Sequence, residues 1–163
     1  MNRYAGIKYN DIVDGEGVCV SFWTQGCPHR CPECHNPQTW DFDGGLEVPS
    51  DIREQLIKAI GANDIQRGFS ILGGEPLCEE NLKLVSDIIL SVREVYPQIK
   101  IYLWSGYTIE ELTTRRRSNS TLNSILSNID VLIEGRYIKE KRDLTLKWRG
   151  SSNQKILYRG KDF

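Results

Sequence analysis

Residues 68–104 decide the fold class of this chain; they read GFSILGGEPLCEENLKLVSDIILSVREVYPQIKIYLW. The stretch opens with a short apolar run, 68–72, and closes with a second one, 99–104, and each run has the composition typical of a buried strand. Between them, residues 79–96 carry apolar side chains at helical spacing, namely Leu82, Val85, Ile88, Ile89 and Val92. A strand, a helix and a second strand in this order predict a βαβ unit with two parallel strands.

The same alternation continues on both sides of that unit. Residues 18–24 and 130–134 are rich in β-branched, aliphatic or aromatic residues, which predicts two further strands. Helices are predicted over 51–60, from Thr108 onward, where a capping-box pattern begins, and over 122–126. We therefore predict an α/β fold with a mostly parallel sheet covered by helices. In such a sheet the functional loops follow the carboxyl ends of the strands.

Length and composition are those of one globular domain. The chain has 163 residues, of which 39% are apolar and 26% charged, so we expect a single domain over residues 1–163.

No apolar run approaches the roughly 18 residues of a membrane helix, and the first residues lack the apolar core of a signal peptide, so we expect a cytoplasmic protein. The net charge of -1 gives no overall footprint for nucleic acid. From about residue 136 the chain is basic and irregular, which indicates either a solvated surface or a contact with an anionic partner.

The cysteines carry the main chemical signal. Cys27, Cys31 and Cys34 form a C-x3-C-x2-C pattern that follows the strand predicted at 18–24. Three thiolates from one short loop can hold an iron–sulfur cluster with one open iron, or a zinc ion that needs a fourth ligand. The candidates for that fourth ligand are His29, His35, Cys19 and Cys78. Cys19 and Cys78 stand beside apolar residues, so we expect them to be packing residues instead.

Two further segments follow predicted strands and therefore reach the same edge of the sheet as the cysteine loop. Gly73-Gly74-Glu75 comes directly after the run at 68–72, and Ser105 comes directly after the run at 99–104. Two glycines let the backbone approach a ligand closely, and a carboxylate can accept hydrogen bonds from an ammonium group. Each segment alone would be an ordinary turn. Because the cysteine loop lies at the same edge, we interpret them as parts of one binding site.

Short motifs spread over the whole chain carry a family resemblance. They are Asp14-Gly15-Glu16-Gly17, Gln25-Gly26-Cys27, Cys34-His35-Asn36, Thr39-Trp40, Leu72-Gly73-Gly74-Glu75-Pro76, Asp130-Val131-Leu132 and Trp148-Arg149-Gly150-Ser151-Ser152-Asn153-Gln154. Together with the cysteine pattern, they resemble the radical S-adenosylmethionine (SAM) superfamily. Within it, they are most similar to the activating proteins of anaerobic ribonucleoside-triphosphate reductases. The resemblance implies an incomplete (βα) barrel of the radical SAM type.

The resemblance also implies a pair of cofactors and a set of site residues. Cys27, Cys31 and Cys34 would hold a 4Fe–4S cluster, and SAM would chelate the remaining iron through its amino and carboxylate groups. The residues implied to bind SAM are Glu33, Cys34, His35, Gly73, Gly74, Glu75 and Ser105, with Gly73-Gly74-Glu75 at the methionine amino group. Many members have an aromatic residue just before the third cysteine. Glu33 stands there in this chain, so His35 or a backbone group is expected beside the adenine.

The activity implied by the resemblance is radical generation on a protein. One electron would cleave SAM, and the resulting 5′-deoxyadenosyl radical would take a hydrogen atom from a glycine Cα of the large reductase subunit. The implied partners are that subunit and an electron donor such as a flavodoxin or ferredoxin, with no nucleic acid and no membrane. The alternatives are an activator of another glycyl-radical enzyme, a small deazapurine-forming radical SAM enzyme and, in a different class, a zinc-binding adaptor. The tail at 147–154 is expected to cover the cluster or to dock the partner, with Arg149 available for a carboxylate.

Overall fold

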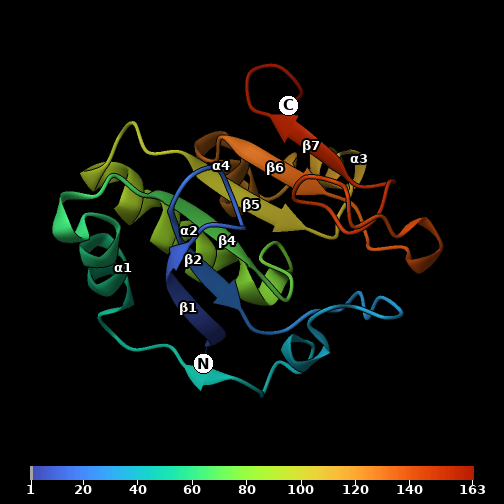
Figure 1. The fold of residues 1–163 in the computed structure, drawn as a ribbon, viewed down its shortest axis with the longest axis horizontal. Coiled ribbons are helices and arrows are strands. Elements are labelled where there is room, and N and C mark those ends of the chain that lie inside the picture. Colours follow the sequence, from blue (N-terminus) through green and yellow to red (C-terminus); the bar gives the residue numbers. More distant parts are fainter. Residues whose placement is uncertain (1) are drawn as a thin grey trace.

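A seven-stranded sheet runs through the computed structural model, which describes residues 2–163 (Figure 1). The strands are β1 (Arg3–Asp11), β2 (Cys19–Thr24), β3 (Leu46–Glu47), β4 (Gly68–Gly73), β5 (Ile101–Ser105), β6 (Val131–Glu134) and β7 (Lys155–Tyr158). Their order across the sheet is β3-β1-β2-β4-β5-β6-β7. The helices are α1 (Ile52–Ile60), α2 (Glu79–Val95), α3 (Ile109–Arg116) and α4 (Ser120–Asn128).

The four central strands form the predicted parallel sheet. β2 pairs parallel with β4, β4 with β5, and β5 with β6. The chain passes through α1 between β2 and β4, through α2 between β4 and β5, and through α3 and α4 between β5 and β6. β1, β3 and β7 pair antiparallel at the two edges, so the sheet is open. The prediction of an α/β fold with a mostly parallel sheet, of the incomplete-barrel type, is confirmed.

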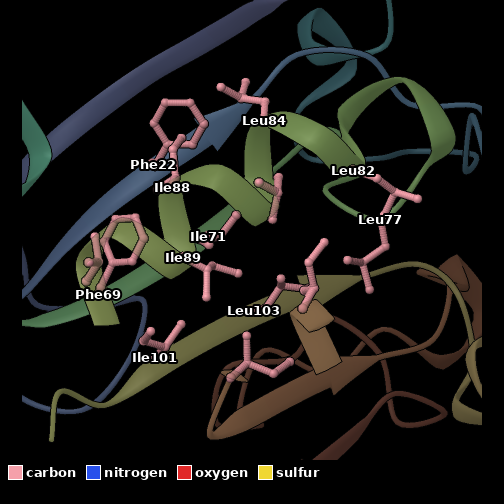
Figure 2. Packing of buried hydrophobic residues seen from close by; sticks show 14 of the residues in the cluster. Phe22, Phe69, Ile71, Leu77, Leu82, Leu84, Ile88, Ile89, Ile101 and Leu103 are labelled. Carbon is pink, nitrogen blue, oxygen red and sulfur yellow. The ribbon is translucent and has the colours of Figure 1, made fainter. Parts of the chain in front are cut away.

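One face of the sheet packs against the helices and forms the main hydrophobic core. Alternate residues of the parallel strands point into this core, among them Phe22 of β2, Ile71 of β4 and Leu103 of β5, all fully buried. Figure 2 shows α2 lying over these strands, with Ile88 and Ile89 directed at them. Burying each such side chain contributes roughly 1.5–3 kcal/mol. This layer therefore fixes where the carboxyl ends of the strands lie relative to one another.

The opposite face of the sheet is covered by the tail instead of by helices. Its apolar cluster contains Cys19, Tyr102, Val131 and Ile133, with Trp148 of the tail packed against them. The rings of Tyr102 and Trp148 meet edge to face, with centroids 5.3 Å apart. The tail thus packs directly on the face of the sheet that the helices leave open.

The structure contains three strands that the sequence analysis does not predict. β1 lacks a buried apolar run because its residues are half-buried or exposed except the last, and β3 is only two residues long. β7 lies in the tail, and the expectation of an irregular tail is wrong for residues 155–158. These residues pair with β6 from Glu134 opposite Lys155 to Val131 opposite Tyr158. The tail is therefore part of the sheet, which a local pattern of four residues could not reveal.

Capping residues explain where the later helices begin. α3 begins as predicted, because Thr108 and Glu111 form the capping box. α4 begins at Ser120, earlier than predicted, because the side chain of Asn119 caps it by accepting a hydrogen bond from Leu122 N at 3.0 Å. Within residues 2–163, none of the helices has the length and apolar character needed to cross a membrane.

Candidate functional site

The loop that carries the three cysteines leaves the carboxyl end of β2 and is closed at its base. Gly26 N donates a hydrogen bond to Thr39 O at 2.7 Å. Cys34 N donates to Cys31 O at 3.1 Å, which makes the second half of the loop a tight turn. The three cysteines of the loop are free, partly exposed thiols. In Figure 1 the loop, in light blue, extends beyond the arrowhead of β2, on the same side as the orange part of the tail.

A cavity of about 540 Å³ lies at this end of the sheet. The predicted site residues that line it are Cys27, Cys31, Cys34, His35, Gly73, Gly74, Glu75 and Ser105. Glu33 does not line the cavity: its side chain is exposed, and its Oε1 lies 3.7 Å from the Lys139 ammonium nitrogen. The structure thus brings together every residue predicted for the site except Glu33.

The turn after β4 requires both of its glycines. Gly73 has a φ of 114°, and a Cβ atom on it would lie 2.5 Å from backbone atoms of Thr24. A Cβ atom on Gly74 would collide with the carbonyl group of Gly26, at the base of the cysteine loop. The backbone N–H of Glu75 donates to that same carbonyl oxygen at 2.8 Å. The glycine turn and the cysteine loop are therefore in direct backbone contact.

The carboxylate of Glu75 is fully buried and has four hydrogen-bond donors around it. Oε1 accepts from Gly106 N at 2.6 Å and lies 2.9 Å from His29 Nε2. Oε2 accepts from Leu77 N and from the Ser105 hydroxyl, each at 2.8 Å. Two carboxylate oxygens offer about four acceptor positions, and all are used. From the sequence, His29 is a candidate only for a zinc ligand, because its partnership with Glu75 depends on the turn after β4 meeting the cysteine loop in space.

The tail supplies a further wall of the cavity. Its lining residues there are Leu144, Leu146, Trp148, Arg149, Gly150 and Gln154. Trp104 of β5 donates from Nε1 to Trp148 O at 2.8 Å, which fixes this part of the tail on the sheet. The Arg149 guanidinium donates to two backbone carbonyl groups, those of Lys147 at 3.1 Å and Gln154 at 3.5 Å. Both of these acceptors are neutral, so among the described residues no carboxylate accepts a hydrogen bond from this guanidinium, whose residue lines the cavity.

Without bound metal, the thiols of Cys27 and Cys31 keep their protons. Burial raises the pKa of Cys27 to about 11 and also raises the pKa of Cys31. Both groups are therefore thiols at neutral pH. Iron binds the thiolate form, so cluster assembly must release these protons.

The donor set fits a 4Fe–4S cluster. Such clusters are held by cysteine thiolates, and three thiolates leave one of the four irons without a protein ligand. The indole Nε1 of Trp40, a residue that also lines the cavity, is buried without a hydrogen-bond partner within residues 2–163. Cluster sulfur atoms accept hydrogen bonds. The sulfur atoms of a cluster in this cavity would thus offer hydrogen-bond acceptors to the indole N–H of Trp40.

An acidic pair beside the cavity was missed by the sequence analysis, although Asp14 stands in one of the quoted motifs. Asp14 lines the cavity, and Oδ1 of the buried Asp11 accepts hydrogen bonds from Val13 N and Asp14 N. Burial, a hydrogen bond with Asp11 and the charge of Asp11 together raise the pKa of Asp14 to about 7. Burial opposes the ionisation of Asp11 as well, but hydrogen bonds from Asp14 and the nearby amides leave its pKa lowered. The carboxyl group of Asp14 therefore keeps its proton up to about pH 7, next to an ionised Asp11.

Comparison with known protein families agrees with this geometry. The family model described as "4Fe-4S single cluster domain" matches residues 13–157, a range that includes the cysteine loop, the glycine turn and most of the tail. The fold and the site thus define an iron–sulfur domain of the radical SAM type.

Curated relatives define the family more narrowly. A protein of Pasteurella multocida is 36% identical over 158 residues, which cover 96% of this chain and 97% of the relative. Proteins of Vibrio cholerae and Escherichia coli K12 are 35% and 33% identical over 147 residues, which cover 90% of this chain and 91% and 92% of the relatives. Each of the three is named an anaerobic ribonucleoside-triphosphate reductase-activating protein. The chain belongs to the family of anaerobic ribonucleoside-triphosphate reductase-activating proteins.

Single alanine substitutions test the ligand set. Replacing Cys27, Cys31 or Cys34 is expected to lower the iron bound after anaerobic reconstitution from about four atoms per chain to below about one, because two thiolates do not hold a cubane. Iron and sulfide analysis measures this. The matched controls are Cys19→Ala and Cys78→Ala, which remove thiols that are 0% and 1% exposed in the packed interior. Loss of iron in either control would contradict the assignment.

The acidic pair predicts a pH dependence of stability. Between the ordinary pKa of 3.8 and about 7, the folded chain holds a proton on Asp14 that the unfolded chain has lost. The contribution of Asp14 to the free energy of unfolding therefore falls as the pH rises through this window and is level above it. Asp14→Asn is expected to remove this fall and to raise Tm at pH 8 by about 2–4 °C, because the amide can donate to Asp11 without ionising. Thermal unfolding from pH 4 to 8 measures both effects. Asp43→Asn, at an exposed position, is the control, and an unchanged pH slope in Asp14→Asn would contradict the raised pKa of Asp14.

Proposed function

We propose that this chain activates an anaerobic ribonucleoside-triphosphate reductase by generating a glycyl radical on its large subunit. The observation that carries the proposal is the single cavity lined by three free thiols and by the Gly73-Gly74-Glu75 turn. Membership of a family whose curated members are named for this activation supports it.

The cofactors supply the radical chemistry, and the chain positions them. When bound, the 4Fe–4S cluster and SAM supply a one-electron cleavage that yields methionine and, after hydrogen transfer from the glycine, 5′-deoxyadenosine. Cys27, Cys31 and Cys34 would hold the cluster through three of its irons, and the fourth iron would be open to the amino and carboxylate groups of SAM. The backbone of Gly73 and Gly74 approaches the methionine amino group, where a side chain would clash. Glu75 places a buried negative charge next to that group.

The remaining lining residues bind the rest of SAM and exclude water. Arg149, whose hydrogen-bond acceptors are neutral carbonyl groups, binds the methionine carboxylate. His35 lines the cavity, its ring centroid 5.1 Å from that of Tyr137, and packs beside the adenine of SAM. Glu33 lies outside the cavity and pairs with Lys139. Trp148 packs on the face of the sheet opposite the helices and keeps solvent from the bond of SAM that is cleaved.

The reductase must reach this cavity through its mouth. Ile12, Val13 and Leu144 are large apolar residues that are 74%, 72% and 73% exposed. Val13 and Leu144 line the cavity from two different loops, and Ile12 is next to Val13. Exposed apolar residues that gather in one place mark a protein contact. We place the glycine-bearing segment of the large subunit between these two loops.

An electron must come from outside the chain, and a small acidic carrier such as a flavodoxin or ferredoxin is the proposed donor. Arg30 is exposed on the cysteine loop, and Lys139 is half exposed beside it. Positive charge on the outer side of the cluster speeds the encounter with an acidic carrier. A cytoplasmic location, where such a carrier would be met, stays a prediction.

No specific observation favours the other candidate functions. The curated relatives quoted above share one name, which does not support an activator of another enzyme or a deazapurine-forming enzyme. A zinc-binding adaptor is not supported either, because the matching family model describes an iron–sulfur domain.

The direct test is an anaerobic incubation of the reconstituted, reduced protein with SAM and the large subunit of an anaerobic reductase. The expected products are 5′-deoxyadenosine and a glycyl radical on the reductase, detected by chromatography and by electron paramagnetic resonance (EPR). A large subunit with its target glycine changed to alanine is the control and should give no such radical. Colourless protein with one tightly bound zinc ion and no SAM cleavage would contradict the proposal.

Charge at the cavity mouth tests where the reductase docks. The double variant Ile12→Asp and Leu144→Asp is expected to weaken binding to the large subunit at least about tenfold. It removes two apolar contacts, and two carboxylates would have to lose their water when the subunit binds. Binding is measured by calorimetry with the metal-loaded protein. Leu90→Asp, at an apolar α2 position that is 46% exposed, is the matched control. Equal affinities for the double variant and the control would place the docking surface elsewhere.

A further inference from the structure

We propose that His29 is a positioning residue, which holds the Gly73-Gly74-Glu75 turn in its SAM-binding geometry by donating a hydrogen bond to Glu75. The inference rests on the proposed function, because it assumes that this turn binds SAM. His29 lies between Cys27 and Cys31, so the same short loop that would hold the cluster also carries this contact.

The contact between His29 and Glu75 joins the middle of the cysteine loop, residues 28–34, to the turn after β4. The other hydrogen bond between this loop and the turn is at the base of the loop. The backbone link is at the base of the cysteine loop, where Glu75 N donates to Gly26 O at 2.8 Å. Among hydrogen bonds of the described chain, the contact of 2.9 Å between His29 Nε2 and Glu75 Oε1 is the one that joins residues 28–34 to the turn after β4. This side chain therefore adds a hydrogen bond between the middle of the cysteine loop and the turn, beyond the backbone contacts at the base of the loop.

The imidazole ring is held in a preformed cage. The side chain of His29 is 7% exposed. Tyr107 packs against the ring edge to face, with centroids 4.6 Å apart. Gly106 lies against the other atoms of the ring, because a Cβ atom there would be 2.5 Å from His29 Cδ2 and 2.8 Å from Nε2. Arg115 stacks on Tyr107 at 4.4 Å and holds the wall of the cage in place. A ring fixed from several sides can orient its partner, which a mobile side chain cannot.

The chemistry of Glu75 explains why the fourth donor matters. Gly106 N and His29 share Oε1, while Leu77 N and Ser105 share Oε2. Without His29, Oε1 keeps one donor, and the buried carboxylate gains by turning toward any nearby cation or iron. With His29 present, the carboxylate stays in place and acts on the ammonium group of SAM through its charge. The three cysteines do not depend on this bond, so cluster loading and SAM binding respond differently to its loss.

Three variants of the full chain test the proposal. His29→Phe keeps a ring but has no donor, and His29→Gln can place an N–H near the position of Nε2. Arg30→Gln, at the exposed neighbouring position, is the control for the loop itself. After anaerobic reconstitution, all three are expected to bind about four irons, as the wild type does. His29→Phe is expected to raise the SAM Kd about tenfold, His29→Gln should recover most of that loss, and Arg30→Gln should leave Kd unchanged.

Two further readouts do not depend on turnover. In the metal-free chain, the Gly106 amide is expected to exchange its hydrogen about tenfold faster in His29→Phe than in Arg30→Gln, because the cage around Glu75 loosens. In the reduced, loaded chain, the change that SAM causes in the EPR spectrum should be smaller in His29→Phe.

The outcomes separate this inference from the proposed function. A His29→Phe variant that loads iron and binds SAM as tightly as the wild type would overturn the inference and leave the function intact. Loss of iron in His29→Phe would also overturn it, because His29 would then serve the cysteine loop itself. A wild-type chain that loads iron but does not bind SAM would overturn the proposed function instead.

Discussion

The burial of one carboxylate, that of Glu75, is the constraint on which the site depends. A carboxylate with no exposure to water is costly unless donors surround it. Here the donors come from the cysteine loop, from the turn after β5 and from the start of the segment that leads into α2. Satisfying that single charge brings three loops from distant parts of the sequence to one point. The cavity is the space that these loops leave beside the sheet.

The parallel sheet makes this meeting possible. β2, β4 and β5 run in the same direction, so the loops that follow them leave at one edge. The helices pack on one face, and the tail covers part of the other, where Trp148 contacts Tyr102 and Trp104. A protein substrate can approach such a site directly, because the tail forms one rim of the cavity and the loop around Val13 forms the other. This open arrangement suits a reaction whose target is a glycine on another chain.

The sequence predicts the parts of the fold that have strong local signals. The strands that become β2, β4, β5 and β6 are apolar runs, α2 has a clear apolar face, and the capping box of α3 is visible in four residues. β1 and β7 could not be predicted in this way, because their residues are only partly buried and carry weak patterns. β7 is an edge strand, and only the two-residue β3 lies outside β1.

The same distinction holds for the site. The cysteines, the two glycines and Glu75 stand in motifs, and the topology places them at one edge. The raised pKa of Asp14 depends mainly on its burial in the fold. The partners of Glu75 and the ion pair of Glu33 with Lys139 arise from contacts between distant segments. No local pattern contains such contacts.

We expect the three cysteines to leave one iron of the cluster free for SAM. Electron–nuclear double resonance on the reduced, reconstituted protein, with SAM labelled with ¹⁵N at its amino group, measures this most directly. The expected result is a hyperfine coupling between the cluster and the labelled nitrogen. A cluster without that coupling, whose fourth iron is bound by a nitrogen or sulfur of the chain itself, would contradict it.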